Sequence, residues 1–146
     1  MKPMTDKELA SKHHIESLTK ADWQPLFDLI PEMENTESFG TWKGGDTDEN
    51  GAINLMYPWE GPIVQTFLEL VYKMGIIVSF DWSAWDEGRE MANTEHFDFD
   101  TVDVFTKCKI ITAIARNDRF CSGALLDAFE SGIILVLLKS IRRQVG

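Results

Sequence analysis

Apolar residues recur at helical spacing along most of the chain. Trp23, Leu26, Phe27 and Ile30 share one face of a predicted helix, which we expect to end at Pro31. Helix-forming residues and this spacing predict further helices over residues 5–18, 62–74, 83–92, 101–116, 120–129 and 133–143. The helix over 101–116 carries apolar side chains around more than half of its circumference. We therefore expect it to lie at the centre of the core.

Two short strands are predicted between the helices over 23–30 and 62–74. They cover residues 39–42 and 53–57, on either side of a Gly- and Asp-rich loop that ends with the turn signal Asn50-Gly51. The β-branched run over 76–80 is a candidate third strand.

Together these elements predict an α+β fold. We expect a predominantly α-helical single domain over residues 1–146, with a small antiparallel β-hairpin of two or three short strands. We expect residues 1–4 to be disordered, as chain ends commonly are.

The net charge of −10 is unevenly distributed along the chain. Residues 22–105 contain most of the acids, whereas residues 106–146 are net basic. The acidic middle argues against nucleic-acid binding, because phosphates would be repelled, and it is compatible with a basic partner protein. There is no apolar signal region near the N-terminus, and the longest apolar run, 133–138, is too short to span a bilayer. We expect a cytoplasmic protein with no membrane contact and no cofactor.

The loop that begins at Asp46 matches the first half of a calcium-binding EF-hand loop. Asp46, Asp48 and Asn50 place short oxygen-bearing side chains on alternate residues, and Gly51 permits the sharp turn. The position that should supply a bidentate glutamate is Tyr57. We therefore favour a solvated hairpin loop over a metal site.

A second candidate site is the aromatic, charged segment that begins at Trp82. Trp82 and Trp85 lie three positions apart near a predicted helix start, and Asp86 and Arg89 have the same spacing, which allows them to pair. Carboxylates beside aromatic walls can acquire a raised pKa, so Asp86 and Glu87 are candidate hydrolase groups. Aromatic pairs of this kind also form binding hot spots. The more frequent alternative is that both Trp side chains are core residues and both acids stabilise a helix N-terminus.

A third candidate is the charged corner between two apolar helices. Arg116 and Arg119 flank Asp118, and an arginine fork can hold a carboxylate or a phosphate. In the structural alternative, Asp118 caps the following helix, while the arginines bind helix carbonyls or pair with Asp86 or Glu87. We favour this alternative, because ion pairs of this kind are common without catalysis.

Two of these segments together resemble a family of small bacterial proteins of unknown function. They read FDWxxWDEGR from Phe80 and RxDRFxxGxL from Arg116, and the second motif is the more specific. In the family that they resemble, the second motif leads into a closing helix with an internal glycine, here Gly132. The resemblance covers residues 13–145. It implies a compact helical domain with a small β element, and it implies no reaction.

The leading functional hypothesis is binding rather than catalysis. The ligand is a small anion or a protein partner, and the candidate ligand-binding residues are Trp82, Trp85, Asp86, Glu87, Arg89, Arg116, Asp118 and Arg119. One alternative is an acidic inhibitor or immunity-type protein that covers a basic partner. The other is a hydrolase that uses Asp86 or Glu87. A homo-oligomer is compatible with all three hypotheses.

Overall fold

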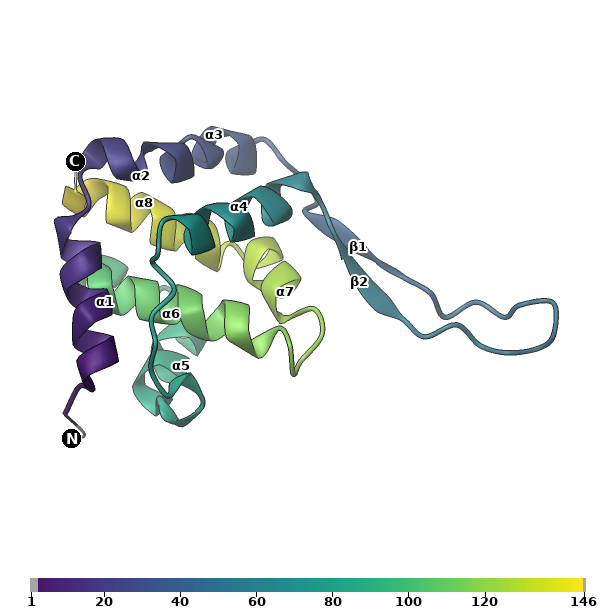
Figure 1. Ribbon diagram of the computed structural model, residues 1–146. Coiled ribbons are helices and arrows are strands. Elements are labelled where there is room, and N and C mark those ends of the chain that lie inside the picture. The colour runs from purple at the N-terminus through teal and green to yellow at the C-terminus, as the bar shows by residue number, and fades with distance from the viewer. Residues whose placement is uncertain (1–2, 146) are drawn as a thin grey trace.

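Helices α6 (Val104–Asn117) and α8 (Ile133–Val145) pack against each other at the centre of the helical body (Figure 1). Both helices have broad apolar faces, and α6 buries residues on several sides, including Cys108, Ile110 and Ile111. The predicted central helix is thus confirmed. Its N-cap is Asp103, which accepts a hydrogen bond from the Thr106 amide at 2.8 Å. The helix therefore begins three residues later than the predicted position 101.

The remaining helices surround this pair. The computed structural model describes residues 3–145. Residues 1–2 of the segment that we expect to be disordered therefore lie outside the described residues. The surrounding elements are α1 (Asp6–Ser17), α2 (Lys20–Phe27), α3 (Leu29–Glu34), α4 (Pro62–Lys73), η1 (Trp82–Ala84), α5 (Asp86–Asn93), η2 (Phe99–Thr101) and α7 (Ala124–Glu130). Helices α2 and α3 lie over α8, whereas α1 and α5 contact α6 (Figure 1). Within residues 3–145, no helix is both long and apolar enough to cross a membrane.

Several predicted helix boundaries differ from the structure, and the helix predicted over 120–129 begins only at Ala124. The helix expected to end at Pro31 instead breaks at Asp28, and Pro31 is accommodated in the first turn of α3. Pro25 lies inside α2. The helix predicted over 83–92 begins only at Asp86, because Ser83 lies in η1.

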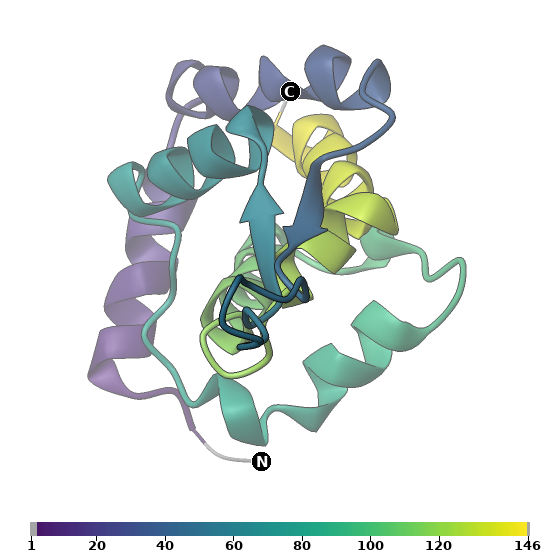
Figure 2. The same cartoon turned by 90° about the vertical axis from the view of Figure 1, so that its right-hand side faces the viewer.

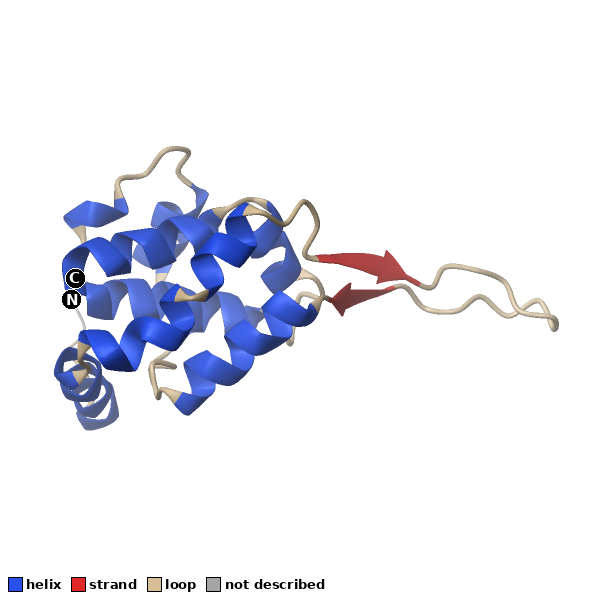
Figure 3. Cartoon of the chain, turned by 90° about the horizontal axis from the view of Figure 1, so that it is seen from above, coloured by secondary structure: helices blue, strands red, loops and turns tan. Residues whose placement is uncertain are grey.

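A β-hairpin extends away from the helical body as an arm (Figures 1 and 3). Strand β1 (Gly40–Lys43) pairs antiparallel with β2 (Tyr57–Glu60), and in Figure 2 the arm points toward the viewer. We define the hairpin arm as residues 40–60. The structure confirms the predicted hairpin. The second strand, however, lies later than the predicted 53–57 and includes Pro58, which a two-stranded ribbon tolerates because each strand has an unpaired edge.

The segment 76–80 is extended but does not form the predicted third strand. Ile76 and Val78 are buried, and the Val78 amide donates a hydrogen bond of 2.9 Å to the hydroxyl of Thr112 on α6. The hairpin leaves the body elsewhere, so this segment has no strand to pair with. A side chain of α6 accepts the backbone hydrogen bond of this segment instead.

One charged network joins α6, α8 and η2, with Lys107 and Ser140 buried and Asp100 and Arg143 partly exposed. The Lys107 ammonium donates hydrogen bonds of 2.6 Å to both Ser140 and Gln144, and Ser140 in turn donates to Asp100. Arg143 also binds both carboxylate oxygens of Asp100, at 3.0 and 3.1 Å. Burial lowers the pKa of Lys107 from its ordinary value, because it disfavours the ammonium form. These hydrogen bonds compensate for the buried charge and join the three elements.

We predict that Asp100→Asn destabilises the fold at neutral pH and that the loss disappears in acid. The hydrogen bonds from Arg143 and Ser140 lower the pKa of the Asp100 carboxyl below its usual 3.8. Its ionised form therefore stabilises the folded state above pH 3.8, and this stabilisation is lost as the pH falls through the lowered pKa. Urea denaturation of both proteins between pH 7 and pH 2.5 measures the difference. Glu95→Gln, on an exposed loop, is the control. A difference that is constant with pH would contradict the prediction.

Candidate functional site

A pocket of about 220 Å³ lies between α5 and α6, and we call it the α5–α6 pocket. Its lining residues come from η1, α5, α6 and the first residue of α7, and they are Trp82, Trp85, Gly88, Arg89, Ala92, Asn93, Ile110, Ala113, Ile114, Asn117 and Ala124. Most of them are apolar or aromatic, with a few polar groups among them. Small-ligand sites usually have this composition.

Trp85 forms one wall of the pocket and is fixed by contacts on several sides. Its indole lies against the backbone of Gly88, one turn later, where an added Cβ would be 2.2 Å from the ring. Phe80 packs edge-to-face on it with ring centroids 5.4 Å apart, and the Lys109 ammonium lies 4.6 Å from the ring centroid. Lys109 also pairs with Glu8 of α1 at 3.4 Å. A glycine at position 88 is therefore required for this wall.

Three polar side chains of the pocket are able to bind a ligand. Arg89 pairs only at 3.4 Å with Asp86 and donates to the Ser83 carbonyl at 3.1 Å, and its side chain is 61% exposed. Within residues 3–145, no hydrogen bond occupies the amide side chains of Asn93 and Asn117. The pocket thus combines a guanidinium group with two free amides.

The structure brings together only part of the predicted site. Trp82, Trp85 and Arg89 line the pocket, whereas Asp86 and Glu87 are exposed and do not. The predicted pair between Asp86 and Arg89 is present. Sequence reasoning missed Asn93 and Asn117, because a lone asparagine on a helix gives no motif.

The charged corner has a different role from that of the pocket. Neither Arg116 nor Arg119 lines the pocket, and neither forms an ion pair within the described chain, residues 3–145. The proposed pairing of these arginines with Asp86 or Glu87 was therefore wrong. Asp118 accepts a hydrogen bond of 3.1 Å from the Leu125 amide in the first turn of α7, as the structural alternative predicted. The two segments still meet, since Trp82 packs on the exposed ring of Phe120 with centroids 5.9 Å apart.

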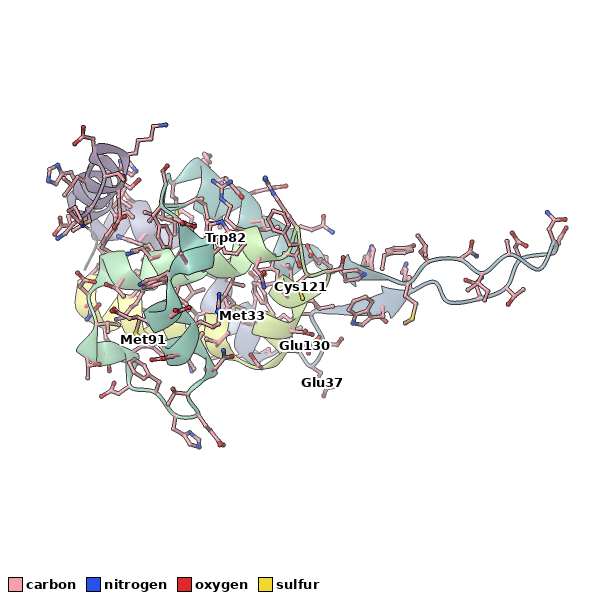
Figure 4. All side chains as sticks on the ribbon, turned by 90° about the horizontal axis from the view of Figure 1, so that it is seen from below. Met33, Glu37, Trp82, Met91, Cys121 and Glu130 are labelled. Carbon is pink, nitrogen blue, oxygen red and sulfur yellow. The ribbon has the colours of Figure 1, made fainter. Side chains whose placement is uncertain are left out.

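The corner also contacts the base of the hairpin arm. Figure 4 places Cys121 at the end of the body from which the arm extends. Trp42 of β1 packs so closely on Gly123 that an added Cβ there would be 2.5 Å from the indole. Glu60, the last residue of β2, lies beside Asp118. Burial and the negative charge of Asp118 raise the pKa of Glu60 above its ordinary 4.5. No pattern in the sequence predicts this carboxyl pair.

The calcium-like loop forms the tip of the hairpin arm. The carboxylate of Asp48 accepts hydrogen bonds from the amides of Asn50 and Ala52, at 2.8 and 2.9 Å. Asp46 accepts one from the side chain of Asn54 at 3.1 Å. Within residues 3–145, no group of three or more His, Cys, Asp or Glu residues is arranged to hold a metal ion. These side chains stabilise a turn, for which Gly51 supplies a positive φ of 83°.

A larger groove of about 520 Å³ lies between the end of α1 and the ends of α6 and α8. Two of its polar side chains already have structural partners. Asp103 caps α6, and Gln144 binds Lys107 and the Val102 carbonyl. The buried indole nitrogen of Trp23, by contrast, forms no hydrogen bond among residues 3–145. We prefer the α5–α6 pocket, because it offers a guanidinium group and two free amides, whereas the groove offers one free indole N–H and the carboxylate of Glu16.

The chain belongs to a family of unknown function (DUF6508), whose model matches residues 18–146. This match confirms the predicted resemblance to a family of unknown function, although it begins at residue 18 rather than 13. No curated protein and no solved structure was found to match the chain. The family assignment therefore brings no reaction, ligand or partner with it.

We predict that Gly88→Ala has opposite effects in two backgrounds. In the wild-type chain the new methyl group collides with the Trp85 ring, and we expect a loss of about 1–3 kcal/mol in unfolding free energy. In a Trp85→Ala background the collision is gone. Alanine then favours the helix, by roughly 0.5–1 kcal/mol. Urea denaturation of the four proteins forms a double-mutant cycle. Additive effects would show that Trp85 does not pack on residue 88.

We also predict that acidification affects Glu60→Gln differently from the wild-type chain. Since the folded-state pKa of Glu60 is raised, its ionised form destabilises the fold above that pKa. This cost is relieved as the pH falls through the raised pKa toward 4.5. The wild-type chain should therefore gain stability relative to Glu60→Gln between pH 7 and pH 4.5. Glu69→Gln, on the exposed face of α4, is the matched control. Parallel pH profiles for wild type and Glu60→Gln would refute the carboxyl pair.

Proposed function

We propose that this protein is a binding module for a small carboxylate-bearing molecule with an apolar body, held in the α5–α6 pocket. The observation that carries the proposal is the meeting of one guanidinium group and two free amides at an indole-walled pocket, contributed by Arg89, Asn93, Asn117 and Trp85. A guanidinium group favours carboxylate ligands, and amide side chains add donors that fix the orientation.

The size of the pocket restricts the ligand. Drug-sized ligands occupy about 300–1,000 Å³. The value of about 220 Å³ suits a single ring or a short chain that ends in a carboxylate. The apolar wall formed by Ile110, Ala113 and Ile114 would contact the body of the ligand, while Arg89 at the mouth would meet its charge.

The other two functional hypotheses have less support from the geometry. A hydrolase needs an acid with a raised pKa inside a concave site. Asp86 and Glu87 lie outside the pocket lining, and the carboxyl with a raised pKa, Glu60, is at the base of the arm. An acidic inhibitor would use the acidic middle of the chain, and its salt-sensitive capture of a basic protein would be the distinguishing measurement.

The proposal is tested by titrating the 15N-labelled chain with benzoate and with 3-phenylpropionate and recording a two-dimensional NMR spectrum at each step. We expect saturable shifts of amides in α5 and the second half of α6. Arg89→Gln should weaken binding at least tenfold, which is about 1.4 kcal/mol. Arg142→Gln, on the exposed end of α8, should leave affinity unchanged. Equal shifts in wild type and Arg89→Gln, or no saturable shifts, would refute the proposal.

A further inference from the structure

The hairpin arm exposes an unusual amount of apolar surface for a segment that contacts the body only at its base. Leu55 is 88% exposed, and the other apolar residues that remain largely in solvent are Trp42, Ile53, Met56, Tyr57 and Trp59. A full aromatic side chain has an area of about 150–250 Å². Together with the exposed fractions of the six residues, this gives roughly 800 Å² of surface that remains in water. The strand register places Trp42 on the opposite face of the ribbon from Tyr57 and Trp59, so a single partner surface covers only part of this area.

The arm also lacks the support that a ribbon of two strands needs. Only β1 and β2 pair, and Thr47 and Ile53 form one isolated bridge further out. A two-stranded hairpin is at best marginally stable in water unless its face is covered. Within residues 3–145, the body contacts the arm through Trp42, Gly40 and Glu60 at the base, and the outer half lies clear of it (Figures 1 and 3).

The tip of the arm is acidic, whereas the corner at its base carries both signs of charge, because Arg116 and Arg119 lie near Asp118 and Glu60. The tip carries Asp46, Asp48 and Glu49, and the corner beside the base carries Arg116 and Arg119. These arginines form no ion pair among residues 3–145. The arm extends away from the body, so its tip cannot reach the corner of its own chain (Figure 1).

A second copy of the chain accounts for the exposed apolar surface, the unsupported ribbon and the unpaired arginines. We propose that the protein forms a twofold-symmetric dimer in which two hairpin arms pack side by side in opposite directions. A twofold axis places each tip beside the base of the other arm. The acids at each tip then face the arginines of the other chain's corner, and the apolar side chains on one face of each arm cover those of the other arm. This interface is separate from ligand binding in the α5–α6 pocket.

Sedimentation equilibrium of the full chain between 5 and about 500 µM tests the assembly. We expect a reversible monomer–dimer equilibrium that weakens as salt rises, because part of the attraction is ionic. Leu55→Ala with Tyr57→Ala should raise the dissociation constant at least tenfold without changing the helical circular dichroism, since the arm contributes no helix. A chain that remains monomeric over the whole range would overturn the proposal.

A charge-reversal experiment tests the arrangement. Asp46→Lys with Glu49→Lys reverses the tip while it keeps Asp48 in the turn, and Arg116→Glu with Arg119→Glu reverses the corner. Each variant alone should dimerise at least tenfold more weakly, because both contacts become repulsive. An equal mixture should recover a heterodimer in native mass spectrometry, because both tip-to-corner contacts are attractive again.

The matched control is Glu69→Lys with Glu95→Lys, which makes the same change in charge on α4 and on an exposed loop. It should leave the dissociation constant within twofold of wild type. A mixture of the tip and corner variants that forms no heterodimer would overturn the antiparallel arrangement, and so would a control that weakens the dimer as much as the tip variant does.

Discussion

The packing of α6 against α8 is the interaction on which the other parts of the molecule depend. Ile110, Ile111 and Leu137 are fully buried or nearly so, and each such side chain contributes about 1.5–3 kcal/mol. The rest of α6 then holds neighbouring elements in place. Thr112 fixes the extended segment 76–80, and Lys109 joins α1 to the aromatic wall of the pocket. A change that shifts α6 would therefore move the pocket as well as the core.

The sequence predicts those parts of the fold that depend on local pattern. The apolar spacing of α6 identifies it as central, and the capping box of Thr19 and Asp22 is present, with hydrogen bonds of 2.8 and 3.2 Å. Gly75 ends α4 with a positive φ of 73°, as its position predicts. These signals are confined to a few consecutive residues, so no tertiary information is needed to read them.

The candidate site is less predictable because its contacts join segments that are distant in the chain. The motif around Trp85 is visible in the sequence, but its packing against Gly88 and Lys109 depends on how η1 and α5 lie on α6. Asn117 becomes a pocket residue only because that helix pairing places it there. The strand shift has a similar origin: periodicity assumes that one face of a strand is covered, and the arm has no second layer to define that face.

The corner between α6 and α7 connects the two candidate surfaces. Asp118 holds the first turn of α7, its charge raises the pKa of Glu60 at the end of β2, and Gly123 receives the indole of Trp42. On the other side of the same turn, Phe120 packs on Trp82 beside the pocket. Residues 118–123 thus lie between the arm and the pocket. Their side chains position the arm on one side and the pocket wall on the other. This segment, which resembles an active site in sequence, is therefore a structural junction in three dimensions.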